Sequence, residues 1–268
     1  MTVSNEQLTA RIHTEVTDAV GWLVVDNAAR RNAVTLAMWR AIPPAVAALD
    51  ADPAVRVIVL RGAGGTTFVA GADISEFETV RGDAASARSY EDENVAAFDA
   101  LRAAVKPTLA MIRGFCLGGG LGLAAACDLR IAEEGALFGI PAARLGVGYP
   151  PSALRDIVNL VGPARTRELL YTARRVDARE AAAIGLVERL VPRDSLDSEI
   201  AALCATLAAN APLTLKAGKR AVAAIAGAPE QADWAAVQAL TDACFDSADF
   251  AEGRNAFLQK RDPVFKGR

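Results

Sequence analysis

The pattern of hydrophobic and polar residues predicts strands through the first two thirds of the chain. Alternation in RIHTEVTDAVGWLVVDN predicts two strands joined by a turn at Asp18–Gly21. The largely apolar runs VRVIVLRG and PTLAMIRG, bounded by glycine or proline, predict buried strands. Helical spacing in VTLAMWRAIPPAVAALDAD predicts a helix interrupted at Pro43–Pro44, and a second helix is expected over 84–105.

The order of these segments predicts an α/β core followed by a helical region. Strand and helix signals recur up to about residue 195. Beyond Pro192 the strand signals stop, and the remaining segments show only helical spacing. We therefore expect a core over 1–195 and a helical region over 196–268, which packs on the core or on a neighbouring subunit.

Composition argues against several classes of function. A net charge of -3 provides no overall field that favours nucleic acid. The four cysteines form no CxxC or CxxH pair, which indicates buried thiols in a reducing compartment rather than disulfides or a metal site. The chain has a single histidine, His13, which lies in a strand-like stretch. The sequence therefore argues against a histidine-based metal site and against a Ser–His–Asp triad.

The chain shows no sign of targeting to a membrane. The stretch MTVSNEQLTARIHTEV is polar and lacks the apolar segment of a secretory signal. No apolar run is long enough to cross a bilayer. We therefore expect no membrane partner and a cytoplasmic location.

Two glycine-centred turns are the strongest candidates for a functional site. The first, FVAGADISEFE, follows a predicted strand, and its Asp73 and Glu76 fit the Ncap and N3 positions of a capping box. The second, Gly118–Gly120, precedes a predicted helix whose positive dipole end would lie at the glycines. Two such turns side by side can direct two backbone N–H groups at one oxygen atom, near Ala72 and the glycines. Glycine would be required because a Cβ atom would block the approach.

Two other interpretations of the second turn stay open. Glycine runs also mark tight packing between a strand and a helix. The segment 120–125 matches GxGxxA, the dinucleotide-binding fingerprint, but that fingerprint needs an acidic residue about 20 residues on, and there is none around Ile140. The sequence therefore favours a main-chain oxyanion hole or simple packing over NAD binding.

Five segments, in order, resemble the enoyl-CoA hydratase/isomerase (crotonase) family and together cover almost the whole chain. They are RRNAVTLAMW, TFVAGADISEF, IRGFCLGGGLGLAAACDLRIA, ARRVDAREAAAIGLVERLVP and EGRNAFLQKRDPVFKG. The resemblance implies a spiral of ββα turns with a C-terminal helical region for trimerisation, in a homotrimer or a hexamer built as a dimer of trimers. It implies an acyl-CoA thioester of fatty acid metabolism as substrate. No cofactor is then expected, since coenzyme A is part of the substrate.

The resemblance also implies roles for single residues. The N–H groups of Ala72 and Gly119 match the oxyanion donors that stabilise a thioester enolate. The implied substrate-binding residues are Ala70, Asp73 and Ile74 in the first turn and Arg30, Arg31 and Ala33, which would run along the pantetheine and phosphates. Phe257 and Lys260 match positions that reach the adenine end of coenzyme A, usually from a neighbouring subunit.

The chain departs from the family pattern where hydratases carry their two catalytic glutamates. The matching positions are Gly122 and Ala142, and neither side chain can activate water, so we do not expect the two-glutamate hydration mechanism. Lyase or isomerase chemistry on an enolate stays open, as does a non-catalytic acyl-CoA-binding protein. LGVGY is similar to LGVPY of methylmalonyl-CoA decarboxylases, which implies a site role for Tyr149, with Arg144 available for a carboxylate. Both residues could instead be structural: a turn residue beside two prolines and a surface ion-pairing residue.

Overall fold

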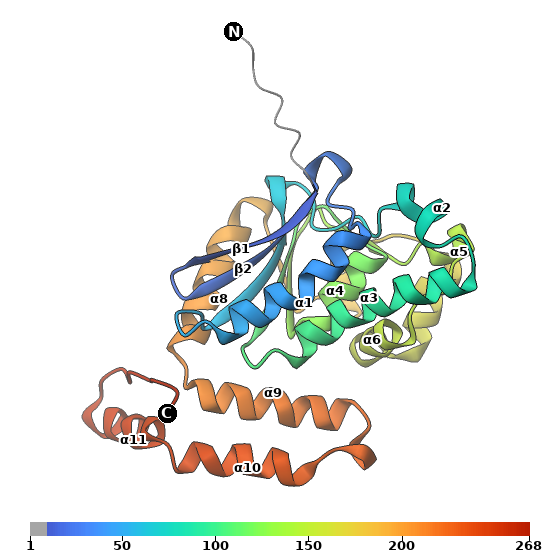
Figure 1. Ribbon diagram of the computed structural model, residues 1–268. Helices are drawn as coiled ribbons and strands as arrows, with labels where there is room; N and C mark the ends of the chain where they lie inside the picture. The colour runs from blue at the N-terminus through green and yellow to red at the C-terminus, as the bar shows by residue number, and fades with distance from the viewer. Residues whose placement is uncertain (1–9) are drawn as a thin grey trace.

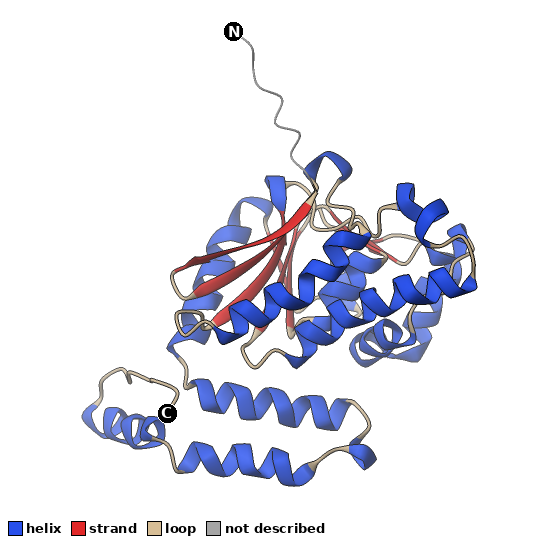
Figure 2. Cartoon of the chain, viewed as in Figure 1, coloured by secondary structure: helices blue, strands red, loops and turns tan. Residues whose placement is uncertain are grey.

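A computed structural model describes residues 10–268 and shows an α/β core with a helical extension (Figures 1 and 2). Within the described residues, the main sheet has six strands in the order β1-β2-β3-β4-β6-β9, antiparallel between β1 and β2 and parallel elsewhere. These strands are β1 Arg11–Thr17, β2 Val20–Asp26, β3 Val57–Gly62, β4 Thr108–Ile112, β6 Leu129–Glu133 and β9 Arg189–Val191. A second sheet pairs β5 Phe115–Leu117, β7 Leu137–Gly139 and β8 Val176–Asp177. The predicted α/β class is confirmed.

Helices cover both faces of the main sheet. The core helices are α1 Leu36–Ala51, α2 Phe77–Val80, α3 Ala84–Ala103, α4 Gly119–Ala126, α5 Ala142–Leu145, α6 Pro151–Thr172, α7 Ala178–Ala183 and α8 Leu196–Ala209. The C-terminal helices are α9 Pro212–Ala226, α10 Trp234–Phe245 and α11 Ala248–Gln259. Short 3₁₀ turns lie at Ala28–Arg30, Ala63–Gly65, Ile74–Glu76, Arg193–Ser195 and Pro229–Gln231.

The central strands are buried on both faces, as their continuous apolar runs predict. Successive strand residues point to opposite sides, so Ile58 and Leu60 join the cluster beneath α1, α3 and α4, whereas Val57 and Val59 pack under α8. Full burial of an aliphatic side chain of this size contributes about 1.5–3 kcal/mol. Apolar burial on both faces therefore stabilises the main sheet around which the helices pack.

The predicted hairpin and first helix both form, with two local differences. The turn lies at Asp18 and Ala19, which have φ values of 50° and 65°, and Gly21 is already within β2. The helix α1 continues through Pro43 and Pro44 without the interruption that we predicted. Its buried stripe, which includes Trp39 and Ile42, packs on the core and offsets the backbone hydrogen bonds that proline removes.

The predicted C-terminal helices are present, but they divide into two groups. α8 packs on the main sheet through residues that include Leu196 and Ile200. The helices α9 and α10 run side by side beyond the core, and α11 ends the extension (Figure 1). Among the described residues, no single helix is long and apolar enough to cross a membrane. Only the bent pair Arg193–Ala209 and Pro212–Ala226 meets that test together, by length and composition alone.

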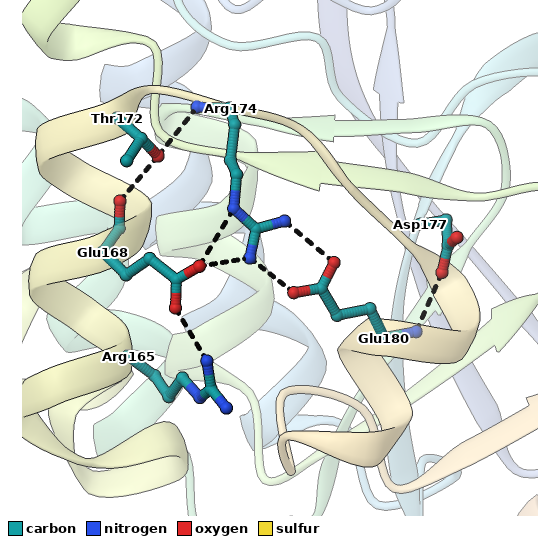
Figure 3. A network of polar contacts seen from close by, with 6 residues as sticks. All are labelled: Arg165, Glu168, Thr172, Arg174, Asp177 and Glu180. Carbon is teal, nitrogen blue, oxygen red and sulfur yellow. Dashed lines mark hydrogen bonds and ion pairs between the residues drawn. The ribbon is translucent and has the colours of Figure 1, made fainter.

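An arginine-centred network joins α6 to α7 (Figure 3). Arg174 donates to Glu168 on α6 at 2.6 Å and to Glu180 on α7 at 2.8 Å. Hydrogen bonds from Arg174 and Arg165 lower the pKa of Glu168, and Arg174 likewise lowers that of Glu180. Arg174 and Glu180 lie on either side of β8 in the sequence. The strand β8 pairs with β7, which ends at Gly139. The network therefore supports the strand that holds the glycine turn.

Candidate functional site

Backbone pairing brings the two glycine-centred turns together. Val69 N–H donates to Phe115 O at 2.9 Å, and Leu117 N–H donates back to Val69 O at 3.0 Å. On the other side of the first turn, Asp73 N–H donates to Val34 O at 2.9 Å. The segment that carries Ala72 is thus held between β5 and the residues that precede α1.

Glycine is needed in the second turn for two separate reasons. Gly118, at φ 52° and ψ −121°, has a backbone conformation that residues with a Cβ atom rarely adopt. Its N–H donates to Gly139 O at 2.9 Å, which fixes the turn against β7. At Gly119, a Cβ atom would lie 2.9 Å from Cζ2 of Trp39 and 4.0 Å from the Ala72 nitrogen. The close approach is therefore to the core tryptophan, whereas the other turn lies at ordinary van der Waals distance.

The two candidate oxyanion donors lie free of internal partners. Within residues 10–268, neither the Ala72 nor the Gly119 N–H donates a hydrogen bond to a protein acceptor. Gly119 is the first residue of α4, where N–H groups point out of the helix and the dipole is positive. An oxygen atom between the two turns could accept from both.

Both amides belong to residues that line one cavity of about 100 Å³. The predicted site residues Ala70, Ile74 and Tyr149 also line it. One wall is formed by α3, and another by the segment 141–150, which includes α5. Three segments far apart in the sequence thus meet around the space in front of the two turns.

Gly122 and Ala142, the two positions that the resemblance matches to catalytic glutamates, are both buried. Gly122 lies inside α4, where an added Cβ atom would be 2.7 Å from Cζ of Phe98. Ala142 is buried at the start of α5 and lines the cavity. At Gly122 an aromatic ring from α3 therefore occupies the space, whereas Ala142 leaves its side of the cavity open.

Tyr149 acts as a hydrogen-bond donor to the glycine turn. Its hydroxyl donates to Gly118 O at 2.8 Å, and that oxygen also accepts from Gly122 N–H at 3.1 Å. Burial raises the pKa of Tyr149 far above its usual value. The side chain therefore stays protonated at neutral pH and braces the turn that presents Gly119.

Asp73 caps the turn Ile74–Glu76, as predicted, and also pairs with Arg30. Its carboxylate pairs with Arg30 Nη1 at 2.8 Å and accepts from Ser75 N–H at 3.0 Å. Burial raises its pKa, but the hydrogen bonds from Ser75 and Arg30 together outweigh burial and lower it. The predicted Ncap position of Asp73 is confirmed, because it caps the turn Ile74–Glu76. The other half of the predicted capping box is wrong, because Glu76 accepts from Leu36 N–H at 2.8 Å instead of from Asp73.

Arg31, Ala33 and Arg144 are not among the residues that line the cavity. The Arg31 guanidinium lies 5.3 Å from the centre of the Phe115 ring. Ala33, two residues further along the chain, is partly buried. Arg144 is exposed on α5 and does not line the cavity. The contacts of this chain therefore give no support to a carboxylate-binding role for Arg144.

Phe257 and Lys260 are remote from the cavity within one chain. Phe257 lies on α11 with 84% of its surface exposed, and Lys260 ends that helix in the left-handed conformation. The helices α2 and α5 lie at one end of the core, and α11 lies beyond the other end (Figure 1). Any contact of these two residues with a ligand in such a cavity would have to come from another copy of the chain.

The sequence indicated that the segment 77–99 would cover the acyl pocket, but it did not single out three polar residues of that segment that line the cavity. Arg81, Glu91 and Asn94 all belong to its wall. Burial raises the pKa of Glu91, although Arg81 acts in the opposite direction. The spacing of Glu91, Asn94 and Phe98 at i, i+3 and i+7 was the available signal, because it places all three on one face of α3.

The cysteines do not line the cavity. Cys116, Cys127 and Cys204 are buried and Cys244 is partly buried, with all four thiols free. Burial raises the pKa of Cys127 to about 12 and that of Cys204 to about 11, so both stay protonated. In the part of the chain that the structure describes, no group of three His, Cys, Asp or Glu side chains is placed to hold a metal ion.

Known sequences of one protein family match this chain over most of its length. The sequence pattern of the enoyl-CoA hydratase/isomerase family matches residues 15–268. The chain is 37% identical over 227 residues to a crotonyl-CoA hydratase of Syntrophomonas wolfei, covering 84% of this chain and 85% of the relative. It is 32% identical over 213 residues to a short-chain-enoyl-CoA hydratase of Clostridium acetobutylicum, covering 80% and 81%.

Solved structures agree with the sequence comparison. An enoyl-CoA hydratase/isomerase family protein from Hyphomonas neptunium superposes with a TM-score of 0.91 at 36% identity, covering 98% of this chain and 100% of that one. An enoyl-CoA hydratase/carnithine racemase from Magnetospirillum magneticum superposes with a TM-score of 0.90 at 37% identity, covering 96% of each. With its crotonase fold, this chain belongs to the enoyl-CoA hydratase/isomerase family of acyl-CoA enzymes.

Proposed function

We propose that the chain binds an acyl-CoA thioester in this cavity and stabilises the enolate of its acyl group. The thioester oxygen accepts from the N–H groups of Ala72 and Gly119, and the positive end of α4 adds to the stabilisation. The observation that carries the proposal is that both amides lack an acceptor within residues 10–268 while their residues line one cavity. A single donor of this kind contributes on the order of 3 kcal/mol to a transition state.

The proposed reaction is enolate chemistry of the lyase or isomerase type rather than two-glutamate hydration. Several relatives are named hydratases. In this chain, however, Gly122 and Ala142 offer no group that can activate a water molecule. The proposed mechanism therefore uses the two backbone amides and neither of the two carboxylates.

Decarboxylation is the second candidate, and the same two positions favour it. When a carboxylate leaves as CO₂, the breaking carbon–carbon bond supplies the electron pair of the enolate, so no base is needed to form it. Tyr149 would then keep the glycine turn in place through its bond to Gly118. Arg144 has no part in this version, since it does not line the cavity.

We further propose that several copies assemble and share the coenzyme A site. Arg30, Arg31 and Ala33 would follow the pantetheine and phosphates, and Phe257 and Lys260 would reach the adenine from another copy. Support comes from large apolar side chains left exposed on α9–α11 of one chain: Val222, Ile225, Phe245, Phe250, Phe257 and Leu258. A homotrimer, or a hexamer of two trimers, would cover such a surface.

We propose a cytoplasmic location, in line with the free buried thiols.

Infrared difference spectra of a bound thioester test the central proposal independently of the reaction. Crotonyl-CoA labelled with ¹³C at the carbonyl should show a lower carbonyl stretching frequency when bound than in water. Gly119→Ala should lose most of this shift, because its Cβ atom would clash with Trp39 and displace the turn that presents the Gly119 amide. Gly218→Ala is the matched control, since no atom lies within 4 Å of the added Cβ. An unshifted carbonyl in the wild-type complex would contradict the proposal.

Turnover assays then separate the candidate reactions. Wild-type protein is incubated with crotonyl-CoA and, separately, with methylmalonyl-CoA, and hydration and CO₂ release are followed. Rapid hydration of crotonyl-CoA would contradict our exclusion of that mechanism. CO₂ release would favour the decarboxylase, and tight binding without turnover of either would favour a binding protein.

A further inference from the structure

Among the described residues that line the cavity, three have ionisable side chains: Arg81, Glu91 and Tyr149. A guanidinium stays protonated at any ordinary pH, so Arg81 cannot act as a base. Burial keeps Tyr149 protonated by raising its pKa, and its hydroxyl proton is already donated to Gly118 O. Elimination therefore leaves the carboxyl group of Glu91 as the group of this cavity that can exchange a proton.

Glu91 meets the cavity from the face of α3 that packs against α4. Glu91 and Phe98 are seven residues apart, about two helical turns, so they lie on the same face of α3. The Phe98 ring packs against Gly122 in the first turn of α4, and that helix begins at Gly119, one of the two amide donors. The side chain of Glu91 is 25% exposed, so a ligand in the cavity can reach it.

The charge of Glu91 also acts on Tyr149, which belongs to another wall of the cavity. Burial is the main cause of the raised pKa of Tyr149, and the negative charge of Glu91 adds to it. The Tyr149 hydroxyl donates to Gly118 O, directly before Gly119 in the chain. The Glu91 carboxylate therefore lies within electrostatic range of the turn that presents an oxyanion donor.

Arg81 holds the Glu91 carboxylate in position. Its Nη2 lies 3.4 Å from Glu91 Oε1, and its guanidinium carbon lies 4.7 Å from the centre of the Phe77 ring and 4.2 Å from that of Tyr90. Burial raises the pKa of Glu91 and the charge of Asp92 acts in the same direction, whereas Arg81 lowers it. A carboxyl group whose pKa is raised toward neutrality is suited to act as both acid and base.

The carboxylates of the first turn are engaged elsewhere. Asp73 pairs with Arg30, and Glu76 accepts from Leu36 N–H. Glu78 is exposed and, like the other two, is not among the residues that line the cavity. None of these three carboxylates is placed to meet an acyl group in front of the two amides.

We propose that Glu91 is the catalytic residue that transfers protons to and from the acyl chain. Its carboxylate takes a proton from Cα, or from Cγ of a 2-enoyl group. The electron pair of the broken C–H bond enters the enolate, whose negative charge rests on the thioester oxygen between Ala72 and Gly119. The same carboxyl group then returns the proton to carbon.

In a decarboxylation, Glu91 performs the return step alone. The pair of the broken carbon–carbon bond forms the enolate as CO₂ leaves, the carboxyl group of Glu91 gives its proton to Cα, and water reprotonates the carboxylate. This inference rests on the proposed function, because it needs the enolate to lie at the amides of Ala72 and Gly119.

Hydrogen exchange in D₂O tests this role without requiring net turnover. The protein is incubated with butyryl-CoA, which can exchange at Cα, and separately with crotonyl-CoA, which can exchange at Cγ, and NMR locates the deuterium. We expect the wild-type protein to catalyse exchange into at least one of the two. Glu91→Gln should slow it about 100-fold or more, because an amide cannot take up the proton. Glu93→Gln is the control, because Glu93 lies on α3 but pairs with Arg40 instead of lining the cavity.

Arg81→Met distinguishes proton transfer from a structural role of the ion pair. The change removes the cation that lowers the pKa of Glu91 but keeps the carboxyl group. Exchange needs the ionised carboxylate and rises with pH through its pKa. In Arg81→Met exchange should therefore persist, with the midpoint of its pH profile moved to higher pH. A loss of exchange equal to that of Glu91→Gln, in a variant that melts like the wild-type protein, would show that the pair only maintains the structure and would overturn the assignment.

The infrared shift of the bound thioester carbonyl separates the two possible failures. Glu91→Gln should keep this shift, because the two amide donors are unchanged. If the wild-type protein shows the shift but no exchange, or if Glu91→Gln exchanges as fast as the wild-type protein, Glu91 is not the proton-transfer residue and the proposed function stands. If the wild-type protein shows neither the shift nor exchange, the proposed function fails together with the inference.

Discussion

The ring of Phe98 occupies the space into which a side chain at Gly122 would extend. A Cβ atom at position 122 would lie 2.7 Å from Phe98 Cζ and 3.0 Å from Cε1. Trp39 packs against Phe98 edge to face, with ring centres 5.8 Å apart, so the ring has little freedom to move away. Packed aromatic volume thus fills the space beside Gly122.

Gly122→Glu should destabilise the protein instead of restoring hydration. Forcing a side chain against Phe98 in a packed core costs about 1–3 kcal/mol. Phe98→Ala alone should cost about 3–5 kcal/mol because it leaves a cavity. In the double variant, the new side chain fills part of that cavity, so the two losses should not add. Urea unfolding of the two single variants and the double variant measures this coupling, and additive losses would show that the two positions do not compete for space.

Tyr149→Phe tests whether Tyr149 positions the glycine turn or transfers a proton. The change removes the 2.8 Å hydrogen bond to Gly118 O, which is worth about 0.5–1.5 kcal/mol. We expect activity on the substrate identified by the turnover assays to fall roughly 10-fold, since that loss is equivalent to about 1.4 kcal/mol. The pH profile of kcat should keep its shape, because the pKa of Tyr149 is raised well beyond the range of the assay. Disappearance of an inflection from the profile would instead assign proton transfer to this residue.

Local patterns explain which parts of the fold the sequence could predict. The strand that includes Ile58 is apolar on both faces, so the sequence correctly predicted that both faces are buried. The break at Pro43 did not occur, because burial of neighbouring residues such as Ile42 depends on packing that a local proline rule does not include. Glu76 pairs with Leu36 N–H, 40 positions away, so its real partner could not be read from capping spacing.

The same distinction applies to the candidate site. The turns around Ala72 and Gly119 were predictable because glycine marks them in the sequence. Arg81 and Glu91 were missed because their access to the cavity depends on how α3 is rotated against its neighbours. Periodicity shows that Glu91 and Phe98 share a helix face, but not that this face meets the cavity.

The ion pair between Arg30 and Asp73 should make stability depend on pH in the acid range. Hydrogen bonds from Ser75 and Arg30 hold the pKa of Asp73 below its ordinary value of 3.8 in the folded protein. A carboxyl group with a lowered folded-state pKa stabilises the fold above its unfolded pKa, and this contribution is lost as the pH falls through the folded value. Asp73→Asn should therefore lower the free energy of unfolding at pH 7 by about 1–3 kcal/mol, and by less at pH 3. Urea midpoints at both pH values measure the difference, and an equal loss at both would mean that ionisation of Asp73 does not contribute.

The exposed face of the C-terminal helices should mediate assembly and complete the coenzyme A site. Val222 and Ile225 on α9 are 65% and 64% exposed in one chain, which is unusual for large apolar side chains outside an interface. Light scattering after size exclusion should therefore give a trimer or a hexamer for the wild-type protein. The double change Val222→Asp and Ile225→Asp should shift it toward the monomer, while leaving the core fold unchanged in circular dichroism.

Phe257→Ala separates assembly from ligand binding at this same face. Phe257 is 84% exposed and remote from the cavity of its own chain, so its loss should not affect the monomer fold. If it stacks on the adenine bound by another copy, the variant should keep the oligomeric mass and bind free coenzyme A roughly 10-fold more weakly, because a base–aromatic stack is worth about 1–3 kcal/mol. Arg254→Ala, also on α11, is the control. Unchanged affinity for coenzyme A in an intact oligomer would show that α11 serves assembly alone.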